Sequence, residues 1–168
     1  MRHVNEQCVE DAYPLPRTED MLVQQGAREI HSALDLQDAF HQIPLAESSR
    51  YITCTATPRG IFQWRVVVMR WKNGVQYCQR NVEVALEEVR HLARGYVDDI
   101  LIGTNRDYAG NTEEDLIRQH FRETRSVLLQ LGRYDLIASL KKAQFFVKEV
   151  EFCGHLFAGG KRHPAKGS

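Results

Sequence analysis

The sequence lacks the marks of several common protein classes. Its four cysteines are widely separated and form no Cys-x-x-Cys pair, which argues against a zinc site and is typical of reduced thiols in the cytosol or nucleus. No run of residues approaches the roughly 20 apolar residues that span a membrane. Residues 1–10 also lack the apolar core of a signal peptide, so we expect neither a membrane protein nor a secreted one.

The chain also has no net charge. Its 22 Lys and Arg residues equal its 22 Asp and Glu residues, whereas a simple nucleic-acid-binding module has an excess of basic residues. A nucleic-acid enzyme is still allowed, because acids gathered at a metal site offset bases elsewhere. With 168 residues, of which 43% are hydrophobic and 26% charged, we expect one globular domain.

Two adjacent aspartates are the most informative feature that is present. Asp98 and Asp99 lie between apolar residues on both sides, and an unpaired carboxylate is costly to bury inside a strand. This pattern predicts a β-hairpin with both acids at its turn. Carboxylates are the hard oxygen ligands that Mg²⁺ prefers, and two-metal phosphoryl transfer needs several of them together. Asp35, which ends the apolar run 33–34, is the candidate third ligand.

Each acid also has a simpler explanation. Asp98 and Asp99 alone could form a solvated turn, where aspartate is favoured. Asp35 could cap a helix that begins near residue 37, and Asp38 fits such a cap or a surface acid better than a ligand role.

The hydrophobic pattern predicts an α+β fold. Strands are expected at 30–36, 51–57 and 61–69, followed later in the chain by the hairpin that turns at Asp98 and Asp99 and by a further hairpin over 144–157. Helices are expected at 18–26, with Thr18 as N-cap and Gly26 after the last turn, and over 75–92. Strands interrupted by long helices indicate an antiparallel sheet with helices on one face.

A further helix is predicted after residue 111. Thr112 can cap it, the three acidic residues 113–115 suit the positive end of its dipole, and Gly132 can close it. Its expected core-facing stripe consists of Ile117, Phe121, Leu128 and Leu131.

Taken in order, the segments resemble the reverse transcriptase of Ty3/gypsy-type long-terminal-repeat retrotransposons and, more distantly, the retroviral enzymes. The similar segments are YPLPR at 13–17, LDLQDAFHQI at 34–43, the block 60–79, YVDD at 96–99, SLKK at 139–142 and FCGH at 152–155. They cover nearly the whole chain. One YxDD box is weak evidence, whereas six segments in the same order and spacing are specific.

The resemblance implies a right-hand polymerase that extends a primer with dNTPs on an RNA or DNA template. The implied catalytic and metal-binding residues are Asp35, Asp98 and Asp99, with the backbone carbonyl of Leu36 as a further ligand. They would hold two Mg²⁺ ions, for which Mn²⁺ can substitute.

Other residues take implied binding roles. The nucleotide-binding residues would be Phe40, under the sugar and excluding a 2′-hydroxyl, together with Arg2, Gln79 and Lys142 or its neighbour Lys141. The primer-binding residues would be Phe152, Gly154 and His155. By themselves these residues have plainer explanations: a core aromatic, a disordered terminus, a solvated lysine pair and a buried strand.

The resemblance also implies a domain plan. We expect partial fingers at 1–30, a palm at 31–157 with a fingers insertion near 50–69, and a basic tail at 158–168. The first finger strands, thumb and later regions are expected to be missing. Within the palm, Val68, Met69 and Arg70 stand where the family has Pro-Phe-Gly, and Arg70 adds bulk and charge where a glycine allows close approach.

These departures leave a second function open. The chain could be a catalytically silent, truncated retroelement remnant that keeps only nucleic-acid binding or a structural role. A third alternative is an inactive partner subunit, since some family members dimerise, so a homodimer is a candidate assembly. No membrane partner is expected, and the expected location is the cytoplasm or nucleus, within a retroelement particle.

Overall fold

The computed structural model describes residues 1–25, 28–106, 112–158 and 161–164. Its helices are α1 (Arg2–Gln7), α2 (Thr18–Gln25), α3 (Ala39–Gln42), α4 (Glu47–Arg50), α5 (Gly74–Leu86) and α7 (Glu113–Arg133), with 3-10 turns η1 (Tyr51–Thr53) and η2 (Glu87–Val89). Its strands are β1 (Ile30–Asp35), β2 (Thr55–Thr57), β3 (Gly60–Phe62), β4 (Ala93–Tyr96), β5 (Asp99–Thr104), β6 (Gln144–Val147), β7 (Glu149–Phe152), β8 (His155–Ala158) and β9 (Lys161–Pro164). No described helix has the length and hydropathy needed to cross a membrane.

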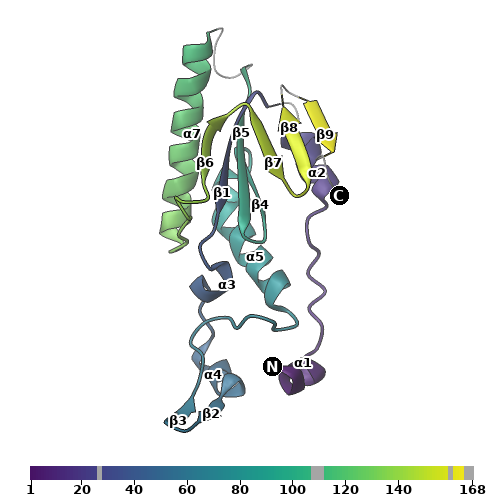
Figure 1. Cartoon of the computed structure of the whole chain (residues 1–168), viewed down its shortest axis with the longest axis vertical. Helices are drawn as coiled ribbons and strands as arrows, with labels where there is room; N and C mark the ends of the chain where they lie inside the picture. The colour runs from purple at the N-terminus through teal and green to yellow at the C-terminus, as the bar shows by residue number, and fades with distance from the viewer. Residues whose placement is uncertain (26–27, 107–111, 159–160, 165–168) are drawn as a thin grey trace.

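A four-stranded antiparallel sheet forms the centre of the molecule, in the order β4-β5-β1-β6 (Figure 1). Successive side chains of a strand point to opposite faces. Ile100 and Ile102 therefore share one buried core with residues of α5 and α7, whereas Leu101 belongs to a second core. The sheet is thus covered on both sides, and residues that alternate with Ile100 face away from the two long helices.

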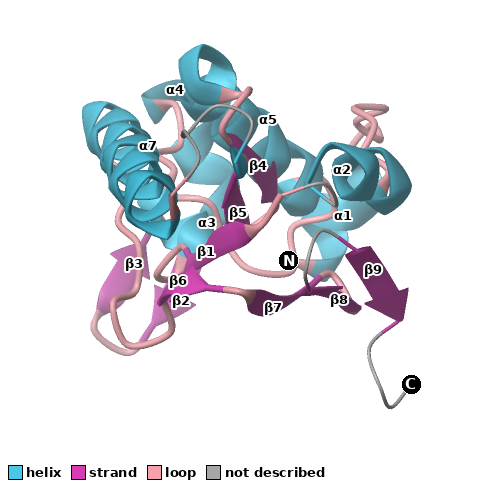
Figure 2. Cartoon of the chain, turned by 90° about the horizontal axis from the view of Figure 1, so that it is seen from above, coloured by secondary structure: helices cyan, strands magenta, loops and turns pink. Residues whose placement is uncertain are grey.

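Helices α5 and α7 cover the first face and touch each other, as Figure 2 shows from above. This is the predicted antiparallel sheet with helices packed on one face. Gly95 lets β4 approach α5 closely, because a Cβ atom at this position would lie 2.5 Å from the side chain of Val82. The predicted helix over 75–92 is confirmed, with its last turn in the 3-10 form.

The second face is partly covered by a three-stranded sheet in the order β7-β8-β9 and by α2. Its core contains Met21, Leu101, Val150, Phe152 and Phe157. Helix α2 begins at Thr18, which had been expected as its cap, and Gly26 lies outside the described residues.

The predicted hairpin over 144–157 is only half right. Strand β6 pairs with β1 of the central sheet, and the hairpin is formed by β7 and β8. Its two turn residues, Cys153 and Gly154, both have positive φ angles of 49° and 73°, as a type I′ turn requires. Part of the expected basic tail, Lys161–Pro164, forms the edge strand β9.

The predicted long strands at 51–57 and 61–69 are wrong over most of their length. Residues 51–53 form η1, and only the short hairpin β2–β3 remains. The side chains of both strands are exposed, so longer strands would gain no stabilisation from packing against a second layer. An isolated two-stranded hairpin is only marginally stable. Figure 1 shows this hairpin, with α4 and α1, at the end of the molecule below the central sheet.

The start of α7 is as predicted, but its buried face is not. The Asp115 N–H donates to the Thr112 hydroxyl at 3.1 Å, which confirms the cap, while the helix continues through Gly132 to Arg133. Of the expected stripe only Leu131 is buried, whereas Ile117, Phe121 and Leu128 are exposed.

Polar residues explain this difference in α7. His120 is fully buried and hydrogen-bonded to the side chains of Ser32 and Thr104, at 2.8 and 2.7 Å. Burial lowers the pKa of His120 to about 4, so it is neutral at pH 7. Glu123 is also buried, bonded to the Thr104 hydroxyl. A pattern that counts only apolar residues misses such a polar buried face.

Arg70 adopts a left-handed conformation, with φ of 65°. We expect Arg70→Gly to raise the free energy of unfolding by about 0.5–1 kcal/mol, because the left-handed region costs an L-residue about 1–2 kcal/mol and glycine's greater chain entropy returns part of this gain. Urea denaturation measures the effect. Arg65→Gly, at an exposed position without positive φ, is the control and should destabilise; an Arg70→Gly variant that also loses stability contradicts the argument.

Candidate active site

Asp35 and Asp99 are brought together by strand register. They are paired residues of the neighbouring antiparallel strands β1 and β5, at the end of both strands. Each alternates with residues of the helix-facing core, so both carboxylates lie on the face away from α5 and α7. The Leu36 N–H donates to the Asp98 carbonyl at 2.7 Å, which ties the turn that carries the third acid to the end of β1.

Asp35 and Asp99, but not Asp98, line a cleft of about 370 Å³ between the central sheet and the β7–β8 hairpin. Its lining includes Asp35, Asp99, Lys142, Phe152 and Gly154, which the sequence had assigned to three different roles. The expected catalytic, nucleotide-binding and primer-binding segments therefore meet at one place. Two further lining residues, Gln144 and Glu151, were not singled out from the sequence; no motif marks either of them.

The turn that carries Asp98 is under backbone strain. Tyr96 pairs with Asp99, which leaves Val97 and Asp98 as a two-residue loop. Of the two only Val97 has a positive φ, of 56°, as in a type II′ turn. A β-branched residue is rare in this region, and such strain persists only where the surroundings hold it.

Gln79 of α5 is hydrogen-bonded to the backbone of this turn from the helix side of the sheet. Its Oε1 accepts a hydrogen bond from the Val97 N–H at 2.7 Å, and its Nε2 donates to the Gly95 carbonyl at 3.0 Å. The side chain is fully buried. The resemblance suggested a nucleotide contact for Gln79; its burial and its two bonds to the hairpin assign it a supporting position behind the acids.

Lys142 is the positively charged residue at the site. Its Nζ donates to both carboxylate oxygens of Asp35, at 3.0 and 2.9 Å. The hydrogen bond to Asp35 is the main cause that raises the pKa of Lys142. The backbone helps to place it, because the Ser139 N–H donates to the Asp35 carbonyl at 2.8 Å. Of the two lysines that the sequence left open, the structure brings Lys142 to the acids.

The acids repel one another. Burial raises the pKa of Asp99, and the negative charges of Asp98 and Asp35 raise it further, while Lys142 opposes this. Repulsion of this kind is what a bound cation relieves, and three carboxylates are suitable ligands for Mg²⁺. Among the described residues no three acidic, histidine or cysteine side chains already stand in a complete metal site. Asp35 and Asp99 supply carboxylate oxygens of the kind that a divalent cation prefers, and in this structure Lys142 is bonded to both oxygens of Asp35.

The remaining predicted residues lie in different surroundings. Phe40 is half-buried and packs against the core beside Gly74, at the start of α5, as the plainer explanation had it. Arg2 lies in α1, with an exposed ion pair to Glu6 at 3.3 Å, at the end of the molecule that also carries α4 and the β2–β3 hairpin (Figure 1). His155 begins β8 and does not line the cleft.

A family model described as reverse transcriptase (RNA-dependent DNA polymerase) matches residues 1–157. The enzymatic polyprotein of cauliflower mosaic virus (strain Strasbourg) is 32% identical over 161 residues, which are 96% of this chain and 22% of that protein. The Retrovirus-related Pol polyprotein from transposon 412 of Drosophila melanogaster is 31% identical over 155 residues, 92% of this chain and 12% of that protein. The chain thus spans less than a quarter of the length of these relatives.

Solved structures of a foamy viral protease-reverse transcriptase share the fold. The structure in complex with dsDNA superimposes with a TM-score of 0.83 at 22% identity, covering 98% of this chain and 27% of that one. The complex with an RNA/DNA hybrid gives a TM-score of 0.80 at 22% identity, covering 98% and 21%. The predicted α+β polymerase fold is confirmed.

Proposed function

The chain belongs to the reverse transcriptase (RNA-dependent DNA polymerase) family, whose model matches residues 1–157, and we propose from this premise that it is the core of an RNA-directed DNA polymerase. It would extend a primer with dNTPs on an RNA or DNA template. One observation carries the proposal: Asp35 and Asp99 are paired across β1 and β5, beside the Asp98 turn, in a cleft that Lys142 also lines.

We propose that Asp35, Asp98 and Asp99, with the Leu36 carbonyl, hold two Mg²⁺ ions, for which Mn²⁺ can substitute. Bound divalent cations would stabilise the charge that develops on the phosphates and lower the pKa of the attacking hydroxyl. Before the cations bind, Lys142 would neutralise Asp35. After this ion pair breaks, the ammonium group of Lys142 would be free to approach the phosphates of the nucleotide. The ion pair supports this role because Lys142 is exposed and can swing away at little cost.

We propose that the nucleotide sugar rests on Phe40 and that Arg2 reaches the triphosphate when the fingers close. Phe152, Gly154 and His155 would form the primer-binding segment, of which Phe152 and Gly154 line the cleft wall. Gln79 would act through the hairpin turn and not through the nucleotide.

The charge distribution supports nucleic acid as the partner. Residues 48–82 contain six Lys or Arg residues and no Asp or Glu. Three aromatic side chains are exposed in the same segment: Tyr51, Phe62 and Trp64. Basic side chains that alternate with exposed aromatic rings suit a nucleic-acid strand. The basic side chains can contact its phosphates, and its nucleobases can stack on the rings. Within this segment Lys72 and Arg80 pair with Glu10 and Asp11, so the other four basic residues, all arginines, carry its basic character.

We expect the double variant Arg59→Gln/Arg65→Gln to weaken template-primer binding at low salt and to flatten its salt dependence. Loss of two phosphate contacts should reduce the slope of log K against log salt by about 2. Fluorescence anisotropy from 50 to 200 mM salt (roughly the range in which such contacts matter) measures it. Arg118→Gln, on the outer side of α7 and paired with Glu114, is the control; an equal effect there would mean that the charge is not localised.

Primer extension tests the proposal. The purified chain is incubated with a primed RNA template, dNTPs and Mg²⁺ or Mn²⁺, beside an Asp98→Asn control. Templated products that are lost in the control support the proposal. Extension that persists in the control would show that another site acts.

A catalytically silent remnant is the second candidate function. It is favoured by the Lys142 ion pair on Asp35 and by the strained Arg70, which stands where the family has glycine. It predicts folded protein that binds template-primer without extending it, even with Mn²⁺.

We also propose the finer identity and surroundings of the chain. We propose a Ty3/gypsy-type element, with which the similarity to a transposon polyprotein is compatible, and long terminal repeats around the gene would test it. We propose partial fingers at 1–30, a palm at 31–157 with the insertion near 50–69, and a location in a cytoplasmic or nuclear particle. Sedimentation would test for a homodimer.

A further inference from the structure

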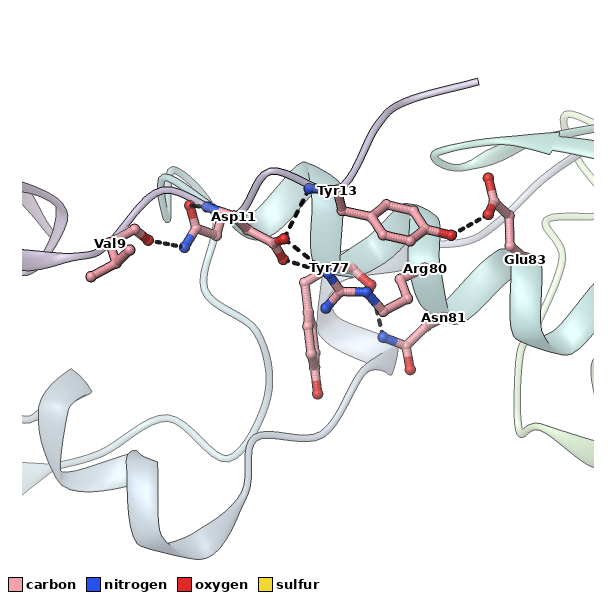
Figure 3. Close-up of polar contacts among 8 residues, drawn as sticks. Val9, Asp11, Tyr13, Tyr77, Arg80, Asn81 and Glu83 are labelled. Carbon is pink, nitrogen blue, oxygen red and sulfur yellow. Dashed lines mark hydrogen bonds and ion pairs between the residues drawn. The ribbon is translucent and has the colours of Figure 1, made fainter. Parts of the chain in front are cut away.

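Residues 9–13, here called the N-terminal strap, are tied along α5 by polar contacts (Figure 3). The Asn73 amide donates to the Val9 carbonyl at 2.8 Å, and the Asp11 N–H donates to the Asn73 side-chain oxygen at 3.2 Å. Arg80 then donates to both carboxylate oxygens of Asp11, at 2.9 and 2.8 Å. Both bonds come from one guanidinium nitrogen, Nη2, and they are charge-assisted because both partners are ionic.

The strap ends at Tyr13, whose side chain is held on several sides. Its N–H donates to Asp11 at 3.0 Å, and the Arg80 guanidinium carbon lies 4.6 Å from the centre of its ring. Its hydroxyl donates a hydrogen bond to one carboxylate oxygen of Glu83, as Figure 3 shows. This bond raises the pKa of Tyr13, so the hydroxyl keeps its proton and stays a donor at neutral pH.

Glu83 continues the contact inward. Its other carboxylate oxygen accepts a hydrogen bond from Gln79 Nε2 at 2.8 Å, one helical turn before it in α5. Gln79 in turn accepts from the Val97 N–H at the strained turn. An unbroken chain of hydrogen bonds therefore leads from Tyr13 through Glu83 and Gln79 to Val97.

The Glu83 carboxylate sets which groups donate and which accept in this series of hydrogen bonds. An ionised carboxylate only accepts hydrogen bonds, so Glu83 requires the amide nitrogen of Gln79 on its side. The amide oxygen then has to face the Val97 N–H. A flipped amide would set oxygen against the Glu83 carboxylate and the Gly95 carbonyl and nitrogen against the Val97 N–H, so this buried side chain would lose all three contacts.

We propose that Tyr13 and Glu83 are positioning residues for the catalytic hairpin. They act through Gln79, whose amide Glu83 orients together with the Gly95 carbonyl, and so they keep Val97 at positive φ and hold Asp98 and Asp99 in place. The catalytic part of this inference rests on the proposed polymerase function, whereas the coupling of the strap to the turn does not.

The coupling is tested without activity, by the amide signal of Val97 in protein labelled with ¹⁵N-valine. The signal is identified by its absence from Val97→Ile. Tyr13→Phe and Glu83→Gln are each expected to shift it while the signals of Val127 and Val150 stay in place. Glu87→Gln, the same change four residues further along and in an exposed ion pair with Arg90, should leave it unmoved.

The catalytic part is tested by steady-state primer extension. Loss of one hydrogen bond in the chain is expected to lower kcat about fivefold to tenfold, with KM for dNTP and template-primer nearly unchanged. Because both residues act through one amide, the double variant should be no slower than Glu83→Gln alone. A loss of general stability would instead scale with the unfolded fraction and would not separate kcat from KM.

Each result of these two experiments either supports or overturns one part of the proposal. An unmoved Val97 signal in both variants overturns the proposal, whatever the activity. A shifted signal with unchanged kcat in an active protein overturns the positioning role. If the unmodified chain does not extend a primer, a shift confined to Val97 still supports the coupling, and the failure belongs to the proposed function.

Discussion

Asp99→Asn is expected to lower the rate of primer extension by a factor on the order of 10³, because a metal-binding carboxylate contributes several kcal/mol to transition-state stabilisation. Asparagine has nearly the same shape, so strand pairing with Asp35 should be kept. Single-nucleotide incorporation on a primed RNA template measures the rate. Glu114→Gln removes an exposed carboxylate from the outer side of α7 and is the control, with an unchanged rate expected.

The same variant is expected to be more stable than the parent chain at neutral pH. Burial and the charges of Asp98 and Asp35 raise the pKa of Asp99 above its ordinary value of 3.8, so ionised Asp99 destabilises the folded state. This penalty is present above the raised pKa and disappears below 3.8, where the carboxyl is protonated in both states. The gain in melting temperature of Asp99→Asn should therefore shrink as the pH falls.

Loss of activity combined with a gain in stability is the outcome to look for. A variant that loses both has been disrupted elsewhere, and the assignment of Asp99 would then need another test. A variant that keeps its activity contradicts the assignment directly. The combination follows from function, because a site built to bind cations keeps its like charges close together at a cost to the fold.

Gln79→Met is expected to lower the free energy of unfolding by about 2–4 kcal/mol, since it leaves the Val97 N–H and the Gly95 carbonyl unpaired in the interior. Methionine has a similar length and volume, so packing changes little. Urea denaturation measures the loss. Extension should fall as well, because the turn that carries Asp98 is no longer held.

Gln63→Met is the control for that experiment. Gln63 is exposed beside the β2–β3 hairpin, so the same substitution should change stability by less than about 0.5 kcal/mol. A small effect of Gln79→Met would mean that the hairpin turn is stable without its support from α5.

The sequence by itself determined the local features of this protein. The apolar runs around the acids specify the β4–β5 hairpin, because a tight turn between two short strands depends only on neighbouring residues. The cap at Thr112 is local for the same reason. The three acids were predicted from their type and spacing, and the order of the motifs indicated a reverse transcriptase, which the match over residues 1–157 then showed.

Only the tertiary structure decided which residues face one another. Strand register pairs Asp35 with Asp99, and the turn after α7 brings Lys142 rather than Lys141 to them, over a separation of 107 residues for Lys142. Gln79 was expected to contact the nucleotide, but its burial assigns it a supporting position behind the hairpin. The hydrogen bond of buried His120 to Thr104 explains why a different face of α7 from the predicted one is buried. Hydrogen bonds between distant segments decide these placements, and hydrophobic periodicity along the chain carries no information about them.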